Sequence, residues 1–354
     1  MLKQCGAFQI QGRPIYCERY GNGHINVTYL VKTDQGVDYI MQKINNQVFR
    51  DVASLMRNIA GVTRHLALSD SDPRHVLTLV KTLQNEDYLH DEDGYWRMYV
   101  FVTDSICLER AESSEDFYQS AVAFGRFQNQ LADYPAATLS ETIPHFHDTP
   151  VRYDNFVAAL EKDIKGRAAG VKDEIAFALA RRQEAAHMTD MQKAGLLPLR
   201  VTHNDTKLNN VMLDLETRKA LCVIDLDTVM PGLSGNDFGD SIRFGASTAA
   251  EDEKDLSKVS MSLDLFAAYA RGFLGACKEN LWQAEIQTLP MGAKLMTLEC
   301  GVRFLTDYLA GDTYFRTHYT DHNLDRCRTQ FKLVADMEDK WLRMQQIIES
   351  EASR

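Results

Sequence analysis

The side chains best suited to chemistry lie between residues 201 and 244. Asp205 follows a strand-like run, and Asn210 comes five residues later. An apolar stretch, predicted as a hairpin, then leads to Asp225 and Asp227. This order gives a carboxylate on a loop, a carboxamide about one turn away and further carboxylates at a strand end. Phosphoryl transfer uses such a set, because a carboxylate accepts or orients the proton of an attacking hydroxyl and oxygen ligands hold magnesium.

A structural explanation has to be weighed against this one. A single Asp in a loop is most often a turn or cap residue. The pattern HxDxxxxN, followed some 15–20 residues later by IDxD after a strand, is much less typical of caps. Because Asp225 and Asp227 are two residues apart on a strand, both could point to one face. The combination therefore favours a functional site.

Composition limits the class of protein. The 354 residues include 39 Lys and Arg against 50 Asp and Glu, a net charge of −11, with 45% hydrophobic and 25% charged residues. These values exclude a disordered chain, and an acidic chain without basic blocks is not typical of nucleic-acid binders. No apolar stretch is long enough to span a bilayer, and the first ten residues lack a signal-peptide core. The seven scattered Cys, none in CxxC spacing, indicate reduced thiols, so we expect a cytoplasmic protein without membrane or nucleic-acid partners.

Around these residues, the first hundred positions have the pattern of a small sheet with one helix. Val27–Val31 and Tyr39–Ile44 flank the turn Asp34-Gln35-Gly36, which predicts an antiparallel hairpin. Apolar residues at a helical period predict a helix over Asp51–Ala67. Further strands are predicted at Val76–Leu83 and Tyr95–Val102.

The remainder is predicted to be mainly helical. Helices are expected at Ser113–Gln130, Tyr153–Ala185, Thr248–Leu274, Ala293–Leu309 and Leu324–Ile348. Short strand-like runs lie between them, at Leu199–Thr202, Asn210–Leu213 and Ala220–Asp225. The best boundary between the two parts is just after Tyr95–Val102, which gives domains of residues 1–103 and 104–354.

HNDTKLNN with VIDLD resembles the aminoglycoside phosphotransferase and choline kinase superfamily. Longer blocks, from about Tyr20 to Lys332, resemble the bacterial N-acetylhexosamine 1-kinases; they include GNGHINVTYLV, FGDSIRFGAST, EDEKDLSKV and ECGVRFLTDYLAGDTYF. The resemblance implies an α+β, two-lobed protein-kinase-like fold. Residues 1–103 would form a small antiparallel-sheet lobe for nucleotide, and residues 104–354 a larger, mainly helical lobe for catalysis and substrate.

The resemblance also implies roles for single residues. Asp205 would be the catalytic aspartate, Asn210 and Asp225 would hold Mg²⁺, and Asp227 would support them or hold a second metal. His203 would hydrogen-bond the loop backbone as a buried structural residue.

Two elements would contact ATP. The backbone at Gly21 and Gly23 would cover phosphates, although a simple β-turn is the alternative. The connection Val100–Asp104, including Phe101 and Val102, would hold adenine.

For the sugar, the matching blocks point to four residues, which are His24, Phe244, Arg303 and Tyr314. An Arg can donate to a hydroxyl or an N-acetyl carbonyl, and aromatic rings stack on a pyranose. Without the resemblance, a surface Arg and core aromatics would be the simpler interpretation.

The segment Asp237-Phe238-Gly239 spells the metal motif of protein kinases, but Asp237 lies 32 residues beyond Asp205, whereas Asp225 lies 20 beyond. We therefore expect Asp237 and Asp240 to support the catalytic loop. A second motif, His145-Phe146-His147-Asp148, resembles a zinc cluster, but further ligands are not evident and prolines bracket it, so we predict a structural loop.

This sequence departs from the family pattern at one position. Kinases of this fold carry a Lys or Arg on the third strand, and that cation pairs with a Glu on the following helix. Gln42 stands at the matching position, and Lys43 should face the opposite way by strand alternation. The helix Asp51–Ala67 has no Glu, so we expect the usual ion pair to be missing.

The sequence and the resemblance together predict a monomeric enzyme that uses ATP and Mg²⁺ to phosphorylate the anomeric hydroxyl of N-acetylglucosamine or N-acetylgalactosamine. Two alternatives stay open. One is a kinase of the same superfamily acting on choline, an aminoglycoside or another sugar. The other is a non-catalytic, pseudokinase-like binding protein.

Overall fold

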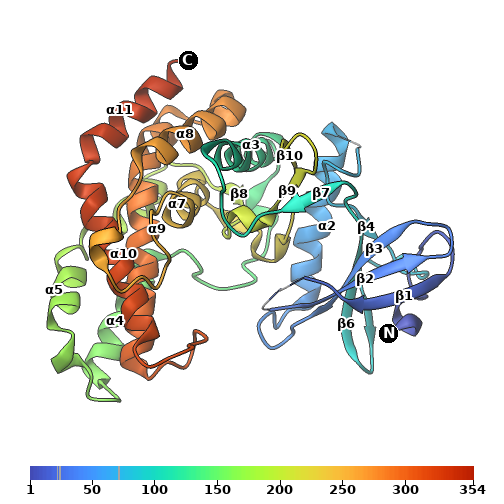
Figure 1. Ribbon diagram of the computed structural model, residues 1–354, viewed down its shortest axis with the longest axis horizontal. Coiled ribbons are helices and arrows are strands. Elements are labelled where there is room, and N and C mark those ends of the chain that lie inside the picture. The colour runs from blue at the N-terminus through green and yellow to red at the C-terminus, as the bar shows by residue number, and fades with distance from the viewer. Residues whose placement is uncertain (22, 24, 71) are drawn as a thin grey trace.

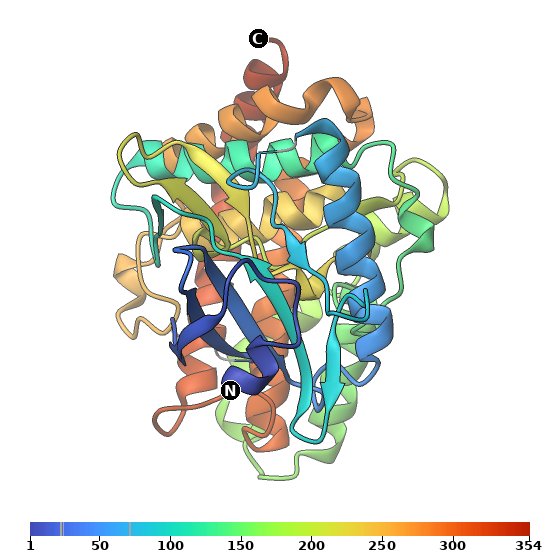
Figure 2. The same ribbon diagram turned by 90° about the vertical axis from the view of Figure 1, so that its right-hand side faces the viewer.

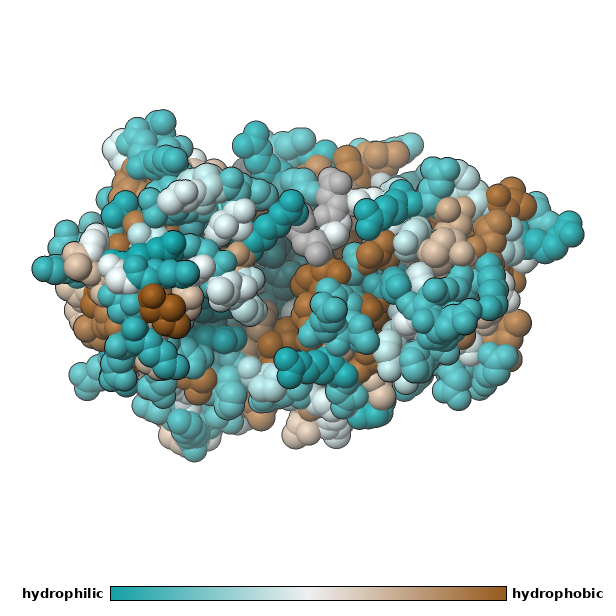
Figure 3. All heavy atoms as spheres, turned by 90° about the horizontal axis from the view of Figure 1, so that it is seen from below, coloured by the Kyte–Doolittle hydropathy of each residue, from teal (hydrophilic) through white to brown (hydrophobic). Residues whose placement is uncertain are grey.

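The computed structural model describes residues 1–354 except Asn22, His24 and Ser71. An antiparallel sheet built from the N-terminal residues lies on one side, and a mainly helical part lies on the other (Figure 1). The surface seen from below is hollowed between these two parts (Figure 3). None of the helices in the described part of the chain combines the length and apolar composition that a membrane crossing needs.

Within the described residues, the strands form three sheets, with orders β1-β2-β3-β6-β4 (β5 also pairs with β6), β10-β9-β7 and β11-β8. The strands are β1 Pro14–Arg19, β2 Val27–Thr33, β3 Asp38–Ile44, β4 Leu79–Val80, β5 Leu89–Asp91, β6 Gly94–Val100, β7 Ser105–Cys107, β8 Arg200–Thr202, β9 Val211–Asp214, β10 Ala220–Val223 and β11 Met230–Gly232.

The α-helices are α1 Leu2–Cys5, α2 Val52–Ser69, α3 Ser114–Gln130, α4 Thr149–Lys162, α5 Lys172–Ala180, α6 His187–Lys193, α7 Ser234–Gly245, α8 Leu263–Cys277, α9 Gln283–Ala310, α10 His322–Asp339 and α11 Trp341–Ala352.

The predicted hairpin is confirmed. β2 and β3 pair antiparallel with Val31 opposite Tyr39, and Gly36 turns the chain with a φ of 77°. The predicted helix that follows is α2, which begins where the Asp51 side chain accepts a hydrogen bond from the Ser54 N–H. The predicted strand Val76–Leu83 is much shorter, because β4 pairs with β6 only at Leu79 and Val80.

Helix α2 runs beside the sheet and packs against the helical part (Figure 2). Its apolar face, including Ile59, Val62 and Leu66, shares one core with Phe124 and Phe127 of α3. The Asn58 side chain donates to the Ser140 and Val229 carbonyls at 2.8 and 3.0 Å. The two parts therefore share a core around α2, and the boundary at residue 103 stays a prediction.

The prediction of one long helix over Tyr153–Ala185 is wrong, because the structure has two separate helices, α4 and α5, in this region. Helix α4 ends at Lys162, because Asp163 and then Gly166 adopt left-handed backbone with φ of 34° and 62°. A right-handed helix cannot continue through such residues. A new helix, α5, begins only at Lys172.

Three other predicted helices have different limits. Helix α8 begins at Leu263 rather than Thr248, because the Ser262 side chain caps it and Ser247 bridges Met261. Helix α9 begins ten residues before Ala293 and contains Pro290. The last predicted helix is two, α10 and α11, separated at Lys340.

Helices α7 and α9 pack at backbone contact through glycines. A Cβ added to Gly292 would lie 2.2 Å from the Gly235 carbonyl oxygen, and one added to Gly239 would lie 2.3 Å from that of Gly292. This close approach fixes α7 against the long helix α9, and α7 in turn supports the loop that carries Asp205.

Candidate active site

The loop that carries Asp205 connects β8 to β9. It ends in a 3-10 turn over Leu208–Asn210, and β9 then pairs with β10 in a hairpin that returns the chain to Asp225. The Ile224 N–H donates to the Asn210 carbonyl at 2.9 Å. The hairpin therefore brings together Asn210 and Asp225, which are fifteen residues apart in sequence.

Both carboxylate oxygens of Asp205 have partners. Lys207 Nζ lies 2.8 Å from Oδ1, and Asn210 Nδ2 donates to Oδ2 at 3.1 Å. Asn210 Nδ2 also donates to the Asp205 carbonyl at 2.8 Å. Burial lowers the pKa of Lys207, but the attraction of Asp205 outweighs it and raises that pKa. The Asp205 side chain is thus fixed in direction beside a charged lysine.

Asp225 is reached by water although protein surrounds it on most sides. The low polarity of its surroundings, together with the nearby Asp227 and Asp205, raises its pKa to about 6. Arg97 and His203 offset this increase only in part, so a cation at Asp225 would supply the remaining counter-charge.

This donor set fits Mg²⁺. In the described part of the chain, no three His, Cys, Asp or Glu side chains gather as metal ligands. Mg²⁺ needs no such cage, because it is held by one or two protein oxygens together with waters and substrate phosphates. Asp225 can supply a carboxylate oxygen. Asn210 can supply its amide oxygen, since Nδ2 is already bonded to Asp205.

Asp227 faces the sheet instead. Its Oδ1 accepts from the Arg97 guanidinium of β6, and its Oδ2 accepts from the Asn26 amide just before β2. The pKa of Arg97 is raised, because the charge of Asp227 outweighs the effect of complete burial. With both oxygens engaged, Asp227 is better placed to join the two parts of the molecule than to hold a second metal.

Arg97 is the residue that sequence reasoning missed. Its Nε donates to Gln42 Oε1 at 2.9 Å, and Gln42 Nε2 donates to Thr28 Oγ1 at 3.1 Å. Lys43 faces the opposite side of the sheet, with Nζ 5.4 Å from the centre of the Trp96 ring, as strand alternation predicted. A signal was available, because Arg97 is the single charged residue in the predicted strand Tyr95–Val102.

The supporting role expected of Asp237 and Asp240 is confirmed. Asp237 accepts from the His203 and Asn204 N–H groups at 2.9 and 2.8 Å, and Asp240 accepts from the Thr206 N–H at 2.9 Å. Burial raises the pKa of Asp237. Burial would also raise the pKa of Asp240, but the attraction of nearby cations, of which Arg243 has the largest effect, outweighs burial and lowers that pKa. His203 is buried and bonds the Ile224 carbonyl at 2.9 Å, also as expected.

On the nucleotide side, Gly21 and Gly23 lie on the connection between β1 and β2, and Gly21 has a φ of 71°. His24, expected to contact the sugar, lies outside the described residues. The N–H of Phe101 donates to the Asp38 carbonyl at 3.1 Å, so only its carbonyl is available to a base. Val102 follows it as a buried residue.

On the acceptor side, Arg303 is half-buried, and its guanidinium lies 5.6 and 5.5 Å from the ring centres of Phe146 and Phe315. Tyr314 is 69% exposed and touches Phe315 edge-on. Phe244 lines a cavity of about 680 Å³ together with Leu208 and Arg243. Within the described residues, no hydrogen bond, ion pair or aromatic contact joins Phe244 to Arg303 or Tyr314.

The motif His145-Phe146-His147-Asp148 forms a structural loop, as predicted. His145 Nδ1 lies 3.1 Å from Oδ2 of its neighbour Asp148. His147 is buried against Glu299 and the Asn204 carbonyl, at 2.9 and 3.0 Å. The two histidines therefore point to different partners.

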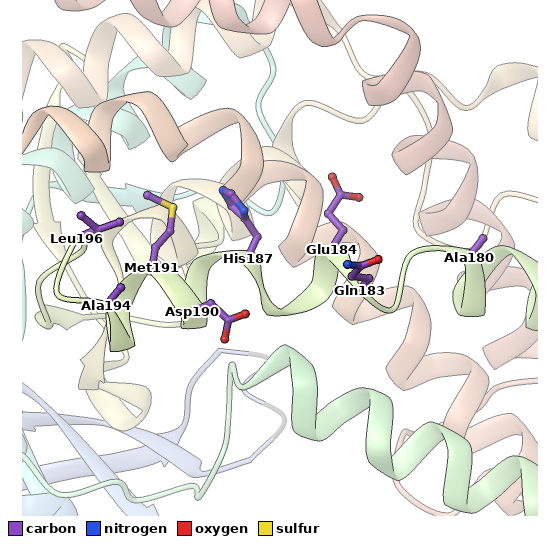
Figure 4. A pocket seen from close by; sticks show the side chains of 8 residues that line it. All are labelled: Ala180, Gln183, Glu184, His187, Asp190, Met191, Ala194 and Leu196. Atoms are coloured by element: carbon purple, nitrogen blue, oxygen red, sulfur yellow. The ribbon is translucent and has the colours of Figure 1, made fainter.

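A second hollow, of about 690 Å³, lies along α5 and α6. Glu184, His187 and Met191 point to the same side of this stretch of chain (Figure 4). The residues lining it include none of those predicted for catalysis, nucleotide or sugar.

Comparison with known proteins identifies the family and the fold of the chain. The model of the phosphotransferase enzyme family (APH) matches residues 17–271. An amicoumacin kinase, solved in complex with AMP-PNP, Ca²⁺ and Ami, is 14% identical with a TM-score of 0.60, covering 96% of this chain and 92% of its own. A microcompartment-associated aminopropanol kinase is 16% identical with a TM-score of 0.62, covering 97% of both chains. A choline kinase from Cryptosporidium parvum is 12% identical with a TM-score of 0.55, covering 96% and 93%. The expected α+β, protein-kinase-like fold is confirmed.

Proposed function

The chain belongs to the phosphotransferase enzyme family, and on that premise we propose that it phosphorylates the anomeric hydroxyl of an N-acetylhexosamine with ATP. N-acetylglucosamine and N-acetylgalactosamine are the two candidate substrates. The product is the sugar 1-phosphate. The longer sequence blocks around Asp205, Phe244 and Arg303 support this substrate class, and the geometry of the side chains supports the reaction.

Asp205 acts on the nucleophile. Its carboxylate accepts the proton of the anomeric hydroxyl, or directs that hydroxyl in line with the terminal phosphate. Lys207 and Asn210 fix the two oxygens, so that little reorganisation is needed when the hydroxyl arrives. Asn210 and Asp225 would hold Mg²⁺, which neutralises the charge that develops on the phosphates.

The sheet provides the nucleotide site. Gly21 and Gly23 present backbone N–H groups to the phosphates. The Phe101 carbonyl and Val102 contact adenine. Arg97 supplies the positive charge that Gln42 lacks, and Asp227 holds it in the place that a helix Glu takes in other kinases of this fold.

A single observation carries the choice of acceptor, namely the state of Arg303. Within the described residues, its guanidinium donates no hydrogen bond and has no carboxylate within 4 Å, although two aromatic rings hold it. A half-buried guanidinium with unused donors suits a neutral acceptor that carries carbonyl and hydroxyl oxygens. Arg152 adds a second positive charge nearby: burial first, and then repulsion by Arg303, lower the pKa of Arg152, so the two guanidinium groups lie close together. These charges disfavour a cationic alcohol.

The test is a coupled assay of ADP release with purified enzyme, ATP and Mg²⁺. The acceptors are N-acetylglucosamine, N-acetylgalactosamine, glucose, galactose, choline and kanamycin. We expect release with the two N-acetyl sugars well above release with the other acceptors. Preference for choline or kanamycin would support the same-superfamily alternative, and no release above the rate without acceptor would support a binding protein.

An Arg303→Gln variant tests whether Arg303 lies in the sugar-binding site. It should raise the Michaelis constant for the N-acetyl sugar while that for ATP stays near wild type. Arg316→Gln is the matched control, because Arg316 is an exposed arginine on the connection between α9 and α10. Equal effects of the two variants on the sugar constant would remove Arg303 from the proposed site.

A further inference from the structure

His147 lies under the catalytic loop although it is 58 residues before Asp205 in sequence. Its Nδ1 is 2.9 Å from Glu299 Oε1 on α9, and its Nε2 is 3.0 Å from the Asn204 carbonyl oxygen. The histidine side chain is 7% exposed, and that of Glu299 is fully buried. Thr149 Oγ1 donates to the other Glu299 oxygen at 2.8 Å, which leaves Oε1 to His147.

Both ring nitrogens of His147 therefore face acceptors. A neutral imidazole carries one N–H, so its second nitrogen would turn a lone pair toward a carbonyl or a carboxylate. With Glu299 ionised, as its lowered pKa favours, the arrangement is satisfied only when both nitrogens carry a proton. A protonated Glu299 would instead donate to Nδ1 of a neutral ring that carries one N–H. Burial by itself would lower the pKa of His147, but the hydrogen bond and charge of Glu299 outweigh it and raise that pKa.

The carbonyl that His147 holds belongs to a constrained residue. Asn204 has a φ of 65°, in the left-handed region that few non-glycine residues adopt, and it directly precedes Asp205. Its N–H donates to Asp237, and its side chain donates to the Thr228 carbonyl at 2.8 Å. His147 holds the Asn204 backbone carbonyl in place. Because this carbonyl belongs to the peptide bond that joins Asn204 to Asp205, His147 helps to set the orientation of Asp205.

We propose that His147 is a positioning residue, kept as an imidazolium by Glu299, which fixes the catalytic loop through the Asn204 carbonyl. The kinetic part of this inference rests on the proposed function, whereas the charge state of His147 does not. His147 touches no reacting group in this arrangement.

The charged groups around His147 decide how it responds to pH. Glu299 faces it from α9, and Asp240 with its partner Arg243 faces it from α7, whereas Arg303 of α9 and Arg152 of α4 act on Glu299. Burial opposes the charge of Glu299, but the bond from His147 outweighs burial and lowers the pKa of that carboxyl. A raised histidine pKa means that the contacts of His147 with Glu299 and the Asn204 carbonyl are complete below that pKa and are lost as pH rises through it. We therefore expect turnover to fall on the alkaline side.

The charge state is tested by NMR on the full-length wild-type protein with ¹⁵N-labelled histidine, and His147→Gln assigns the signal. We expect two N–H-bearing ring nitrogens for His147 at pH 7 and a titration midpoint above about 6.5, the value of an unperturbed histidine. A neutral ring at pH 7, or a midpoint at or below about 6.5, would overturn the inference whether or not the protein is a kinase.

The effect on catalysis is tested by pH profiles of turnover, with His145→Gln as the control from the same loop. His147→Gln should lower turnover by about 10- to 100-fold, because small displacements of a catalytic group have effects of that order. The Michaelis constant for ATP should change little. Glu299→Gln should move the alkaline limb about 1 pH unit lower, as loss of a close opposite charge does.

Two outcomes would refute this role in favour of a simple packing role. His147→Gln with the turnover and pH profile of His145→Gln would refute it. A uniformly lower rate in Glu299→Gln with an unmoved alkaline limb would also refute it. If the wild-type protein phosphorylates no acceptor, its basal ATP hydrolysis serves for the same profiles, so that failure of the proposed function is distinguishable from failure of this inference.

Discussion

Replacing Arg97 with Gln would leave the Asp227 carboxylate buried without its cation. The two side chains are 1% and 6% exposed, so water can replace little of the lost interaction. Removing one partner of a buried ion pair destabilises a protein by about 3–5 kcal/mol. The Asn26 amide still donates to Asp227, which favours the lower part of that range. We therefore expect Arg97→Gln to lower the free energy of unfolding by about 3 kcal/mol.

The measurement is urea unfolding followed by tryptophan fluorescence, with Lys43→Gln as the matched control. Lys43 is the next cation on this sheet, but it lies over Trp96 on the opposite face. Its replacement should lower stability by no more than about 1 kcal/mol, the usual size of an exposed cation–π contact. The double variant Arg97→Gln with Asp227→Asn should be more stable than the sum of the single effects predicts, because it leaves no buried charge unpaired.

The same variants test the nucleotide site. Arg97→Gln should raise the Michaelis constant for ATP, whereas Lys43→Gln should leave it near wild type. A stable Arg97→Gln variant together with a destabilised Lys43→Gln variant that binds ATP poorly would show that β3 and β6 are out of register and that Lys43 is the buried cation.

The other predictions concern the catalytic loop and its neighbours. Asp205→Asn keeps the shape but removes the proton acceptor, so turnover should fall about 10²–10⁴-fold with nucleotide binding retained; a loss of only a few-fold would remove Asp205 from the mechanism. Asp225→Ala should abolish Mg-ATP binding in calorimetry, while Asp237→Ala should mainly lower stability because it leaves the His203 and Asn204 N–H groups unpaired; the reverse pattern would assign the metal to Asp237. Gln42→Ala should cost about 0.5–1.5 kcal/mol in the kcat/KM for ATP, as for a neutral hydrogen bond, and a loss above about 3 kcal/mol would mean that Gln42 does more than orient Arg97.

Local signals in the sequence were sufficient for much of the fold. The β2–β3 hairpin followed from alternation around Gly36, and α3 begins at Ser113, where a reciprocal capping box with Asp116 closes its first turn. The Tyr153–Ala185 prediction failed because apolar periodicity continued across Asp163. A single left-handed residue ends a helix without interrupting that periodicity.

The site residues also fall into those that the sequence predicted and those that it did not. Asp205, Asn210 and Asp225 lie on one β-hairpin and its flanking loops, so their spacing in sequence was enough to predict that they meet. Arg97 and Asp227 are 130 residues apart, and His147 and Glu299 are 152 apart. Such pairs meet only through the packing of separate elements, and spacing in one sequence contains no signal for it.

The central claim is the formation of a sugar 1-phosphate, which phosphorus NMR of the reaction mixture tests directly. Enzyme, ATP, Mg²⁺ and N-acetylglucosamine or N-acetylgalactosamine should give a new phosphomonoester signal coupled to the anomeric proton, at a rate that Asp205→Asn reduces about 10²–10⁴-fold. A phosphomonoester signal coupled to the C6 protons, or inorganic phosphate as the sole product, would contradict the claim.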